Sequence, residues 1–251
     1  MAIATQAARE SGRILKDYYY QTKRIESKGN RNLLTEVDLL SEKNILKILH
    51  DEFPDHSILC EESGENEKAG EYQWIVDPLD GTTNYAFGIG HFCVSVALAR
   101  DDEVLLGVIY DPLRDELFRA QKGEGAYLND SPIAPAGERD LRTKLVGFDL
   151  GYSDSASREM LSRANQAWHP EVTFRLMGSA ALGITYVACG RLDIYFHRSI
   201  YPWDIAAAVM LIREAGGEII DGEGNPATLW SKRVIACGDF KEHRGLIAAL
   251  N

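Results

Sequence analysis

Two acidic residues stand three positions apart in the stretch VDPLDGTTNY, residues 76–85. Asp77 and Asp80 lie on either side of Pro78, and Gly81 follows them. A loop that only turns the chain needs one such acid, because a single Asx side chain beside proline and glycine satisfies the turn. The second acid therefore indicates that a cation binds here.

Further acids stand where predicted elements begin or end. Glu61 and Glu62 follow the apolar run SILC, and Asp204 opens a predicted helix. Hard divalent cations such as Mg²⁺ prefer carboxylates, backbone carbonyls, water and phosphate oxygens, so these segments could meet at one metal site. Gly81 would let backbone N–H groups approach a bound phosphate without a Cβ in the way, and Thr82 could donate its hydroxyl.

Each of these residues also has a purely structural interpretation. Asp77 is typical of a turn before proline, the glutamate pair is typical of a solvated loop, and Asp204 is typical of a helix amino terminus. Asp38 closes the motif TEVD, which is typical of a capping box that begins with Thr35. From the residues alone, both interpretations remain open.

Composition and charge exclude several classes of protein. The chain has 251 residues, 45% of them hydrophobic, which is enough for a large core. Lys and Arg total 27 against 38 Asp and Glu, so the formal net charge is −11 and no broad basic surface can bind a phosphate backbone. We therefore expect no nucleic-acid partner, although bound cations could still attract a small anionic substrate.

The four cysteines are scattered and form no C-x-x-C pair, so they predict neither a zinc site nor a disulfide framework. The first twenty residues lack the continuous apolar segment of a signal peptide. No apolar run approaches the roughly 20 residues of a membrane span. We therefore expect a soluble, cytoplasmic protein with reduced thiols and no membrane partner.

The first part of the chain predicts two helices over a meander of strands. Residues 2–20 show helical spacing, and a second helix, with Leu39, Leu46, Leu49 and Phe53 as its buried stripe, ends in FPDH. The polar stretch ENEKAGEYQ predicts a surface loop. The runs WIVD, HFCVSVALAR, EVLLGVIYDP, ELFRAQ and AYLND then predict a mostly antiparallel sheet.

The remaining chain predicts alternating strands and helices. The strands are KLVGFDL, TFRLMG, LDIYFH, EIID and RVIACG, and they alternate with helices that include SAALGITYVACG and WDIAAAVMLIREAGG. We therefore predict two subdomains, an α+β unit over residues 1–135 with the antiparallel sheet and most of the candidate ligands, and an α/β unit over residues 136–251.

Several of these motifs occur together in one known family. WIVDPLDGTTNY, with EES before it and WDIAAAVMLIREAGG after it, resembles the signature set of the inositol monophosphatase family, Mg²⁺-dependent phosphatases related to fructose-1,6-bisphosphatase. LLTEVD, GEGAYLND and GSAALGITYVACGRLDIY extend the resemblance over almost the whole chain. The resemblance implies a layered αβαβα sandwich with the active site between its halves, and a homodimer.

The resemblance also implies a metal site. It makes Glu61, Asp77, Asp80 and Asp204 ligands of two to three Mg²⁺ ions, and the backbone carbonyl of Leu79 completes one site. Lithium inhibition is implied in the same way. In such an enzyme a metal-bound water attacks phosphorus in line, without a covalent protein intermediate.

The family pattern assigns the remaining catalytic roles by position. Gly81 and Thr82 would hold the phosphate through their backbone N–H groups. Asp80 and Asp204 are expected to contact the substrate as well as the metal. The Thr82 hydroxyl, with Glu61, would orient the attacking water, and Asp38 would polarise that threonine or a metal-bound water.

Substrate choice is implied by residues away from the metal. Ser179 and Ala180 match the family's helix start near the sugar ring. His197 stands where inositol monophosphatases typically carry a glutamate, which weakens the expectation of strict inositol specificity. We expect His197 and Arg198 to face the leaving group, where Arg198 could bind a second phosphate, as in fructose 1,6-bisphosphate. The alternative is that Arg198 is a solvated loop residue.

Three kinds of function are consistent with the sequence. The first is Mg²⁺-dependent hydrolysis of a small polyol or sugar phosphate, such as myo-inositol 1-phosphate. The second is hydrolysis of fructose 1,6-bisphosphate, histidinol phosphate or 3′-phosphoadenosine 5′-phosphate. The third is a regulatory role in which the same fold binds a protein partner, for example in transcription or ribosome assembly. The intact acids at all five matched positions from Asp38 to Asp204 favour catalysis.

Overall fold

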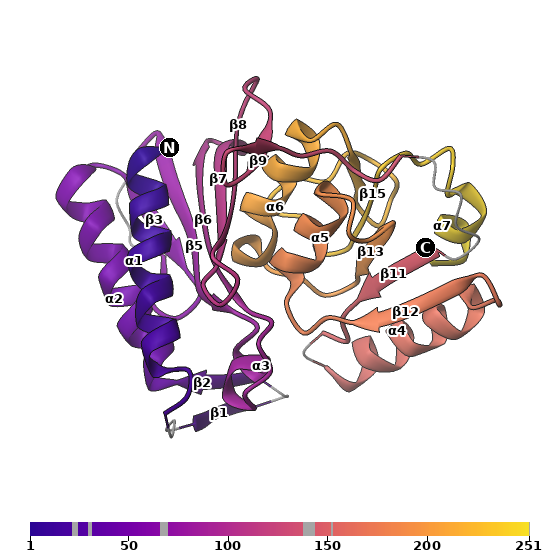
Figure 1. Ribbon diagram of the computed structural model, residues 1–251, viewed down its shortest axis with the longest axis horizontal. Coiled ribbons are helices and arrows are strands. Elements are labelled where there is room, and N and C mark those ends of the chain that lie inside the picture. Colours follow the sequence, from indigo (N-terminus) through magenta and orange to yellow (C-terminus); the bar gives the residue numbers. More distant parts are fainter. Residues whose placement is uncertain (22–24, 30–31, 66–69, 138–143, 152, 251) are drawn as a thin grey trace.

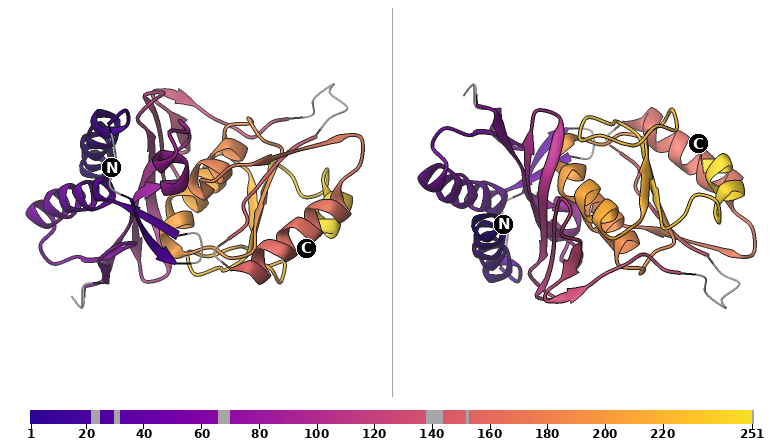
Figure 2. Two further views of the ribbon diagram at one scale, coloured as in Figure 1. Left: turned by 90° about the horizontal axis from the view of Figure 1, so that it is seen from below. Right: turned by 90° about the horizontal axis from the view of Figure 1, so that it is seen from above.

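The protein is built of five stacked layers. The computed structural model describes residues 1–21, 25–29, 32–65, 70–137, 144–151 and 153–250. Figures 1 and 2 show two helices, a sheet, two further helices, a second sheet and an outer pair of helices, in that order. The predicted αβαβα sandwich is confirmed. None of the helices in the described ranges is both long enough and apolar enough to cross a membrane.

The first layer contains α1 (Ala2–Tyr18) and α2 (Glu36–Glu52), which confirms both predicted helices. A short antiparallel pair, β1 (Ile25–Gly29) and β2 (Asn32–Thr35), lies between them in the chain. The face of α1 that meets its neighbours consists mainly of small residues such as Ala4, Ala7 and Ala8, which let the helix approach closely.

The buried stripe of α2 differs from the predicted one. Leu49 is buried as predicted, but Leu39 is 50% exposed. The rest of the inward face carries Val37 and Ile45 together with buried polar residues. One of these, Ser41, donates its hydroxyl to the Pro78 carbonyl at 2.8 Å. The stripe was mispredicted because part of the inward face of this helix is polar.

The first sheet is the predicted meander with one parallel addition. Its order is β10-β9-β8-β7-β6-β5-β3-β4, and every pairing is antiparallel except that of β3 with β5. The strands are β3 (Ser57–Cys60), β4 (Gly64–Glu65), β5 (Tyr72–Asp80), β6 (Cys93–Arg100), β7 (Glu103–Asp111), β8 (Glu116–Gln121), β9 (Ala126–Leu128) and β10 (Ser131–Pro132). Residues 66–69 of the predicted surface loop lie outside the described residues.

The second sheet has the order β12-β11-β13-β15-β14. Its strands are β11 (Lys144–Phe148), β12 (Val172–Leu176), β13 (Ile194–His197), β14 (Glu218–Ile220) and β15 (Val234–Cys237). β11 runs parallel to both β12 and β13, so these three strands end at the same edge. The outer face is covered by α4 (Asp154–Ala167) and α7 (Arg244–Leu250).

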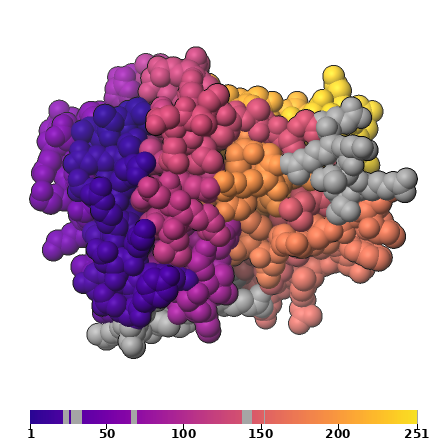
Figure 3. All heavy atoms as spheres, in the orientation of Figure 1, coloured from indigo at the N-terminus to yellow at the C-terminus, as the bar shows by residue number. Residues whose placement is uncertain are grey.

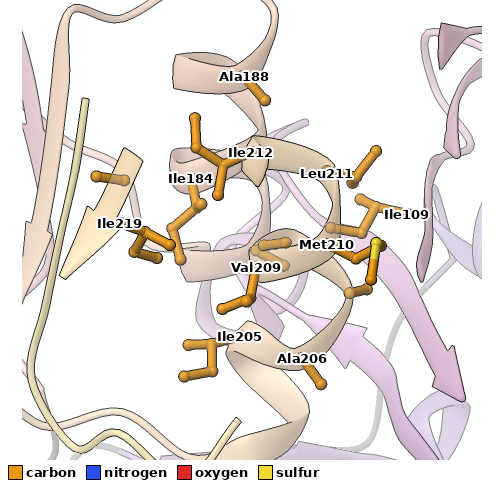
Figure 4. Packing of buried hydrophobic residues seen from close by; sticks show 14 of the residues in the cluster. Ile109, Ile184, Ala188, Ile205, Ala206, Val209, Met210, Leu211, Ile212 and Ile219 are labelled. Atoms are coloured by element: carbon orange, nitrogen blue, oxygen red, sulfur yellow. The ribbon is translucent and has the colours of Figure 1, made fainter. Parts of the chain in front are cut away.

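The middle layer joins the two sheets. It contains α5 (Ala180–Ala188) and α6 (Pro202–Glu214), and α6 is apolar almost all round because it is buried between sheets. Figure 4 shows its side chains packed against Ile109 of β7 on one side and Ile184 and Ile219 on the other. A Cβ on Gly107 of β7 would lie 2.5 Å from the Ala207 carbonyl oxygen, so this glycine allows α6 to lie directly on the strand. The halves therefore form one continuous body (Figure 3).

Candidate active site

β5 carries two of the predicted metal ligands into a buried position. The strand is buried along its last seven residues, and its pairing with β6 shifts register between Asp77 and Asp80. Pro78, which has no N–H, lies in this irregular segment, and the Leu79 N–H donates to Asp77 Oδ1 at 2.9 Å. In a regular strand, residues three apart point to opposite faces, so this irregularity is what allows both acids to join one cluster.

Asp204 reaches the same point from the first turn of α6. Its Oδ2 accepts the backbone N–H of Tyr201 at 2.8 Å, so Asp204 also caps its own helix. Carboxylate oxygens of Asp77, Asp80 and Asp204 all lie within 4.8 Å of one another, and all three residues are buried. The hydrogen bond that caps α6 is therefore compatible with the predicted metal-ligand role of Asp204.

Glu61 adds a fourth carboxylate from the neighbouring strand. β3 runs parallel to β5 with Cys60 opposite Val76, so Glu61 and Asp77 are the next residues along the two strands. Glu61 lines the same cavity as the three aspartates. Its backbone N–H donates to the Val76 carbonyl at 3.2 Å, which continues the pairing beyond the end of β3.

The electrostatics of this cluster favour a bound cation. Burial raises the pKa of Asp77 well above its ordinary value, and the nearby charges of Glu61, Asp80 and Asp204 raise it further. Burial, Asp80 and Glu61 act in the same direction on the pKa of Asp204. Neither lysine nor arginine is found among the described residues that line the cavity. Converging carboxylates with no cationic side chain match the ligands that divalent ions prefer.

Thr82 lies between the cluster and α2. Its hydroxyl is 2.9 Å from the carbonyl oxygen of Leu79 and 3.1 Å from Asp38 Oδ1. Asp38 also forms the predicted capping box, because its Oδ2 accepts the Thr35 N–H at 2.9 Å. Burial raises the pKa of Asp38 to about 6. Asp38 therefore caps the start of α2 with one oxygen and accepts the Thr82 hydroxyl with the other.

Gly81 occupies a position that excludes a side chain. It precedes the short helix α3 (Thr82–Ala86) with φ of 92°, a left-handed conformation that favours glycine. A Cβ here would lie 3.0 Å from the His91 carbonyl oxygen and 3.1 Å from that of Gly178. The loop after β5 is thus packed directly against the segment that leads into α5.

Ser179 and Ala180 hold Asp80 from the opposite half of the molecule. The N–H groups of Ala180 and Ala181 donate to the two oxygens of Asp80 at 3.2 and 3.0 Å, and the Ser179 hydroxyl donates to the same carboxylate. Burial raises the pKa of Asp80, and these hydrogen bonds oppose the rise. The amino terminus of α5 therefore fixes one oxygen-rich wall of the cavity.

The structure separates the two residues that were expected to face the leaving group. His197, the last residue of β13, is buried and lines the cavity, and burial lowers its pKa to about 4. Arg198 instead pairs with Glu159 of α4 at 2.7 Å and is not among the cavity-lining residues. Successive residues of an extended chain point to opposite sides, so a histidine facing the cavity directs its neighbour away from it.

Asp149 lines the cavity as well, and the sequence reasoning missed it. It directly follows β11, and it is buried. The available signal was an acid at the end of the apolar run KLVGF, the same signal that drew attention to Asp77. Asp149 was overlooked because no second acid stands near it in the sequence.

The predicted site residues other than Asp38 and Arg198 line one cavity of about 410 Å³, together with Asp149, and this cavity is lined by both halves of the chain. This volume is in the range of small-molecule sites. The arrangement combines an acidic floor, the glycine loop before α3 and the amino terminus of α5. It can bind divalent cations together with a small anionic ester.

Comparison with known proteins gives concordant matches. A sequence model described as the inositol monophosphatase family matches residues 1–251. The chain is 38% identical over 238 residues to the protein named Nus factor SuhB of Pasteurella multocida, covering 93% of this chain and 89% of that one. It is 39% identical over 242 residues to inositol monophosphatase 2 of Solanum lycopersicum, covering 93% and 91%. The solved structure of inositol monophosphatase from Anabaena matches with a TM-score of 0.84 at 37% identity, covering 100% of this chain and 94% of that one.

Proposed function

This chain belongs to the inositol monophosphatase family and is a phosphatase, and we propose that its substrate is a small polyol or sugar phosphate such as myo-inositol 1-phosphate, with Mg²⁺ as cofactor. The observation that carries the proposal is the convergence of three buried aspartates within 4.8 Å of one another. A fourth carboxylate, Glu61, lines the same cavity. Such a cluster has a use in phosphoryl transfer, where cations offset the charge of the phosphate.

The residues around the cluster are suited to hold two to three cations. Glu61, Asp77, Asp80 and Asp204 would supply carboxylate oxygens, and Leu79 would supply its backbone carbonyl. Bound Mg²⁺ lowers the pKa of a water molecule and stabilises charge on the phosphoryl oxygens. The amino terminus of α5 holds the Asp80 carboxylate, so that ligand is already oriented before any cation binds.

The protein's own groups then orient water and substrate. Asp38 accepts a hydrogen bond from the Thr82 hydroxyl, so a lone pair of that hydroxyl oxygen can accept a hydrogen bond from water. Gly81 and Thr82 would offer backbone N–H groups to the phosphate, where a glycine permits close approach. Ser179, Ala180 and His197 would lie on the leaving-group side.

The proposal is tested by phosphate release from a panel of esters. The panel contains myo-inositol 1-phosphate, fructose 1,6-bisphosphate, histidinol phosphate and 3′-phosphoadenosine 5′-phosphate, each with Mg²⁺ and with EDTA. We expect release that depends on Mg²⁺ and is fastest with a polyol or sugar monoester. A preference for another member of the panel would replace the substrate proposed here.

Relatives named Nus factor SuhB favour a second candidate function, a protein-binding role on the same fold. A binding role of this kind does not need the metal cluster. It would therefore persist in Asp80→Asn, and affinity purification with the wild-type protein and with this variant distinguishes the two functions. We also propose a homodimer, which light scattering after size exclusion would measure.

A further inference from the structure

A second pocket, with a basic lining, lies on the outer side of the first sheet. It is formed by α1, the end of β7 and the turn that follows β7, and its volume is about 240 Å³. This volume is below the roughly 300–1,000 Å³ of sites for drug-sized ligands, so the pocket suits a small ion or a single polar group. No described residue lines both this pocket and the cavity at the acid cluster, and Figure 1 shows α1 on the side of the sheet that faces away from the second half.

One wall of this pocket is held in place by close packing and hydrogen bonds. A Cβ on Gly12 would lie 2.5 Å from the Tyr110 ring, so this glycine lets α1 lie against the end of β7. The Tyr110 hydroxyl donates to Asp115 Oδ1 at 2.8 Å, and the same oxygen accepts a hydrogen bond from Arg9 at 2.9 Å. The Arg9 guanidinium also lies over the Tyr110 ring, 5.1 Å from its centroid. Arg9 is therefore fixed in the wall, and the charge of Asp115 offsets its own.

Two further cations line the pocket without a matching acid. Arg13 and Lys16 follow Arg9 at spacings of four and seven residues, so all three lie on one side of α1. In the part of the chain that the structure describes, neither Arg13 nor Lys16 forms an ion pair, and the nearby acids Glu10 and Asp17 do not line the pocket. The lining therefore has two positive charges in excess, although the whole chain has a formal net charge of −11.

We propose that this pocket is a second, non-catalytic anion site that binds a phosphate dianion, either free phosphate or the phosphate group of a small ester. Two unmatched cations balance the charge of about −1.5 to −2 that a phosphate monoester carries at pH 7. Arg13 can donate two parallel hydrogen bonds to phosphate oxygens, and the Lys16 ammonium adds a point charge. Lys16 also stands in the last turn of α1, where a cation stabilises the helix dipole, but Arg13 lies before that turn and has no such role.

The test measures how phosphate stabilises the protein at pH 8 after metal has been removed. Metal is stripped with EDTA, and the EDTA is then dialysed away because it is itself a polyanion. Without metal, the carboxylates of the acid cluster repel phosphate, so binding in the larger cavity is suppressed. A ligand that binds only the folded state raises the melting temperature as its concentration rises. We expect a larger rise with sodium phosphate than with sodium chloride at equal ionic strength.

Two double variants assign this effect to the pocket. Arg13→Gln with Lys16→Gln should weaken the apparent affinity for phosphate at least about tenfold, the loss expected for a hydrogen bond to a charged group. Both side chains are exposed, so this variant should fold. Lys47→Gln with Arg158→Gln is the control, because it removes one lysine and one arginine from exposed positions outside the pocket. Phosphate also stabilises folded proteins in general, and this contribution is the same in both variants.

A loss of phosphate stabilisation that is confined to the pocket variant supports the site. An equal effect of phosphate on the wild-type protein and the pocket variant would overturn it, since Arg13 and Lys16 would then be solvated cations only. An equal loss in both double variants would overturn it as well, because the effect would then follow net charge. Glycerol 2-phosphate identifies the source of the ligand in a supporting result: stronger stabilisation by this ester indicates a phosphorylated metabolite, and stronger stabilisation by inorganic phosphate indicates the free ion.

Discussion

The Thr82 hydroxyl lies 3.1 Å from Oδ1 of Asp38, although the two residues are 44 positions apart in the chain. Asp38 is in turn fixed at the start of α2, where its other oxygen accepts the Thr35 N–H. The orientation of a hydroxyl beside the acid cluster is therefore set by the first turn of a helix in the outer layer.

This relationship predicts that Asp38 and Thr82 act as one unit. Thr82→Ala and Asp38→Asn should each lower kcat by roughly 100-fold, the lower end of general acid–base effects, with a smaller change in KM. The double variant should be about as active as the worse single variant, because each change already breaks the same pair. Steady-state kinetics of the four proteins measures this, and losses that multiply would show that the residues act independently.

The repulsion among the carboxylates predicts opposite effects of Asp77→Asn on stability and metal binding. Asp77 is buried near three other acids, so removing its charge should raise the melting temperature in EDTA. Mg²⁺ should then stabilise the wild-type protein but not the variant. Thermal melts with EDTA and with Mg²⁺ check both effects. Asp51→Asn, an exposed change on α2, is the control and should alter neither.

The buried carboxyl of Asp149 predicts that the stability difference between Asp149→Asn and the wild-type protein depends on pH. Burial raises its pKa to about 7 from an ordinary value of 3.8, so the folded protein holds this proton at pH values where the unfolded chain releases it. Its contribution to stability is full below about pH 4 and is lost as pH rises to about 7. Asp149→Asn lacks this loss, so it should gain on the wild-type protein by up to about 4 kcal/mol across that window.

Urea unfolding of both proteins in EDTA at pH 5 and pH 8 measures the part of this gain that develops above pH 5, about 3 kcal/mol. Taking the difference between variant and wild type cancels the opposite effect of the histidines whose pKa values burial lowers, which are His56, His91, His197 and His243. Parallel pH curves for the two proteins would mean that Asp149 is ionised in the folded state throughout.

Replacing Gly81 by alanine should lower the free energy of unfolding by more than backbone strain alone explains. Gly81→Ala adds a Cβ at 3.0 Å from the His91 carbonyl oxygen, in addition to the strain of φ at 92°. Gly123→Ala is the matched control, since φ is 79° there and nothing lies within 4 Å. The control should cost about 1–2 kcal/mol and retain activity. Gly81→Ala should cost more and abolish phosphate release, and equal free energies of unfolding for the two variants would contradict the close packing of the loop.

The fold and the acid cluster were largely predictable from the sequence, because apolar periodicity and acids at strand ends are local signals. The buried stripe of α2 was not predictable in this way, because its inward face carries Asp38 and Ser41 at positions where a periodic pattern predicts apolar residues. Leu39 was misassigned for that reason. The hydrogen-bond partners of these buried polar residues, Pro78 and Thr82, lie elsewhere in the chain. The sequence of the helix alone therefore cannot reveal them.

The cavity wall away from the metals depended on long-range register. Nothing near Asp149 in the sequence shows that it lies beside His197, because their proximity comes from the pairing of β11 with β13. The partner of Arg198 is on α4, and only the folded chain brings Glu159 to it. This wall was therefore the least predictable part of the cavity.

The most direct measurement is the rate of phosphate release from myo-inositol 1-phosphate as Mg²⁺ is varied, with the wild-type protein and with Asp80→Asn. The account predicts that the wild-type rate rises from near zero in EDTA and saturates with Mg²⁺, while Asp80→Asn stays near zero at every concentration and remains folded. Release by the wild type that is independent of Mg²⁺, or an equal rate from Asp80→Asn, would contradict the assignment of the acid cluster as a catalytic metal site.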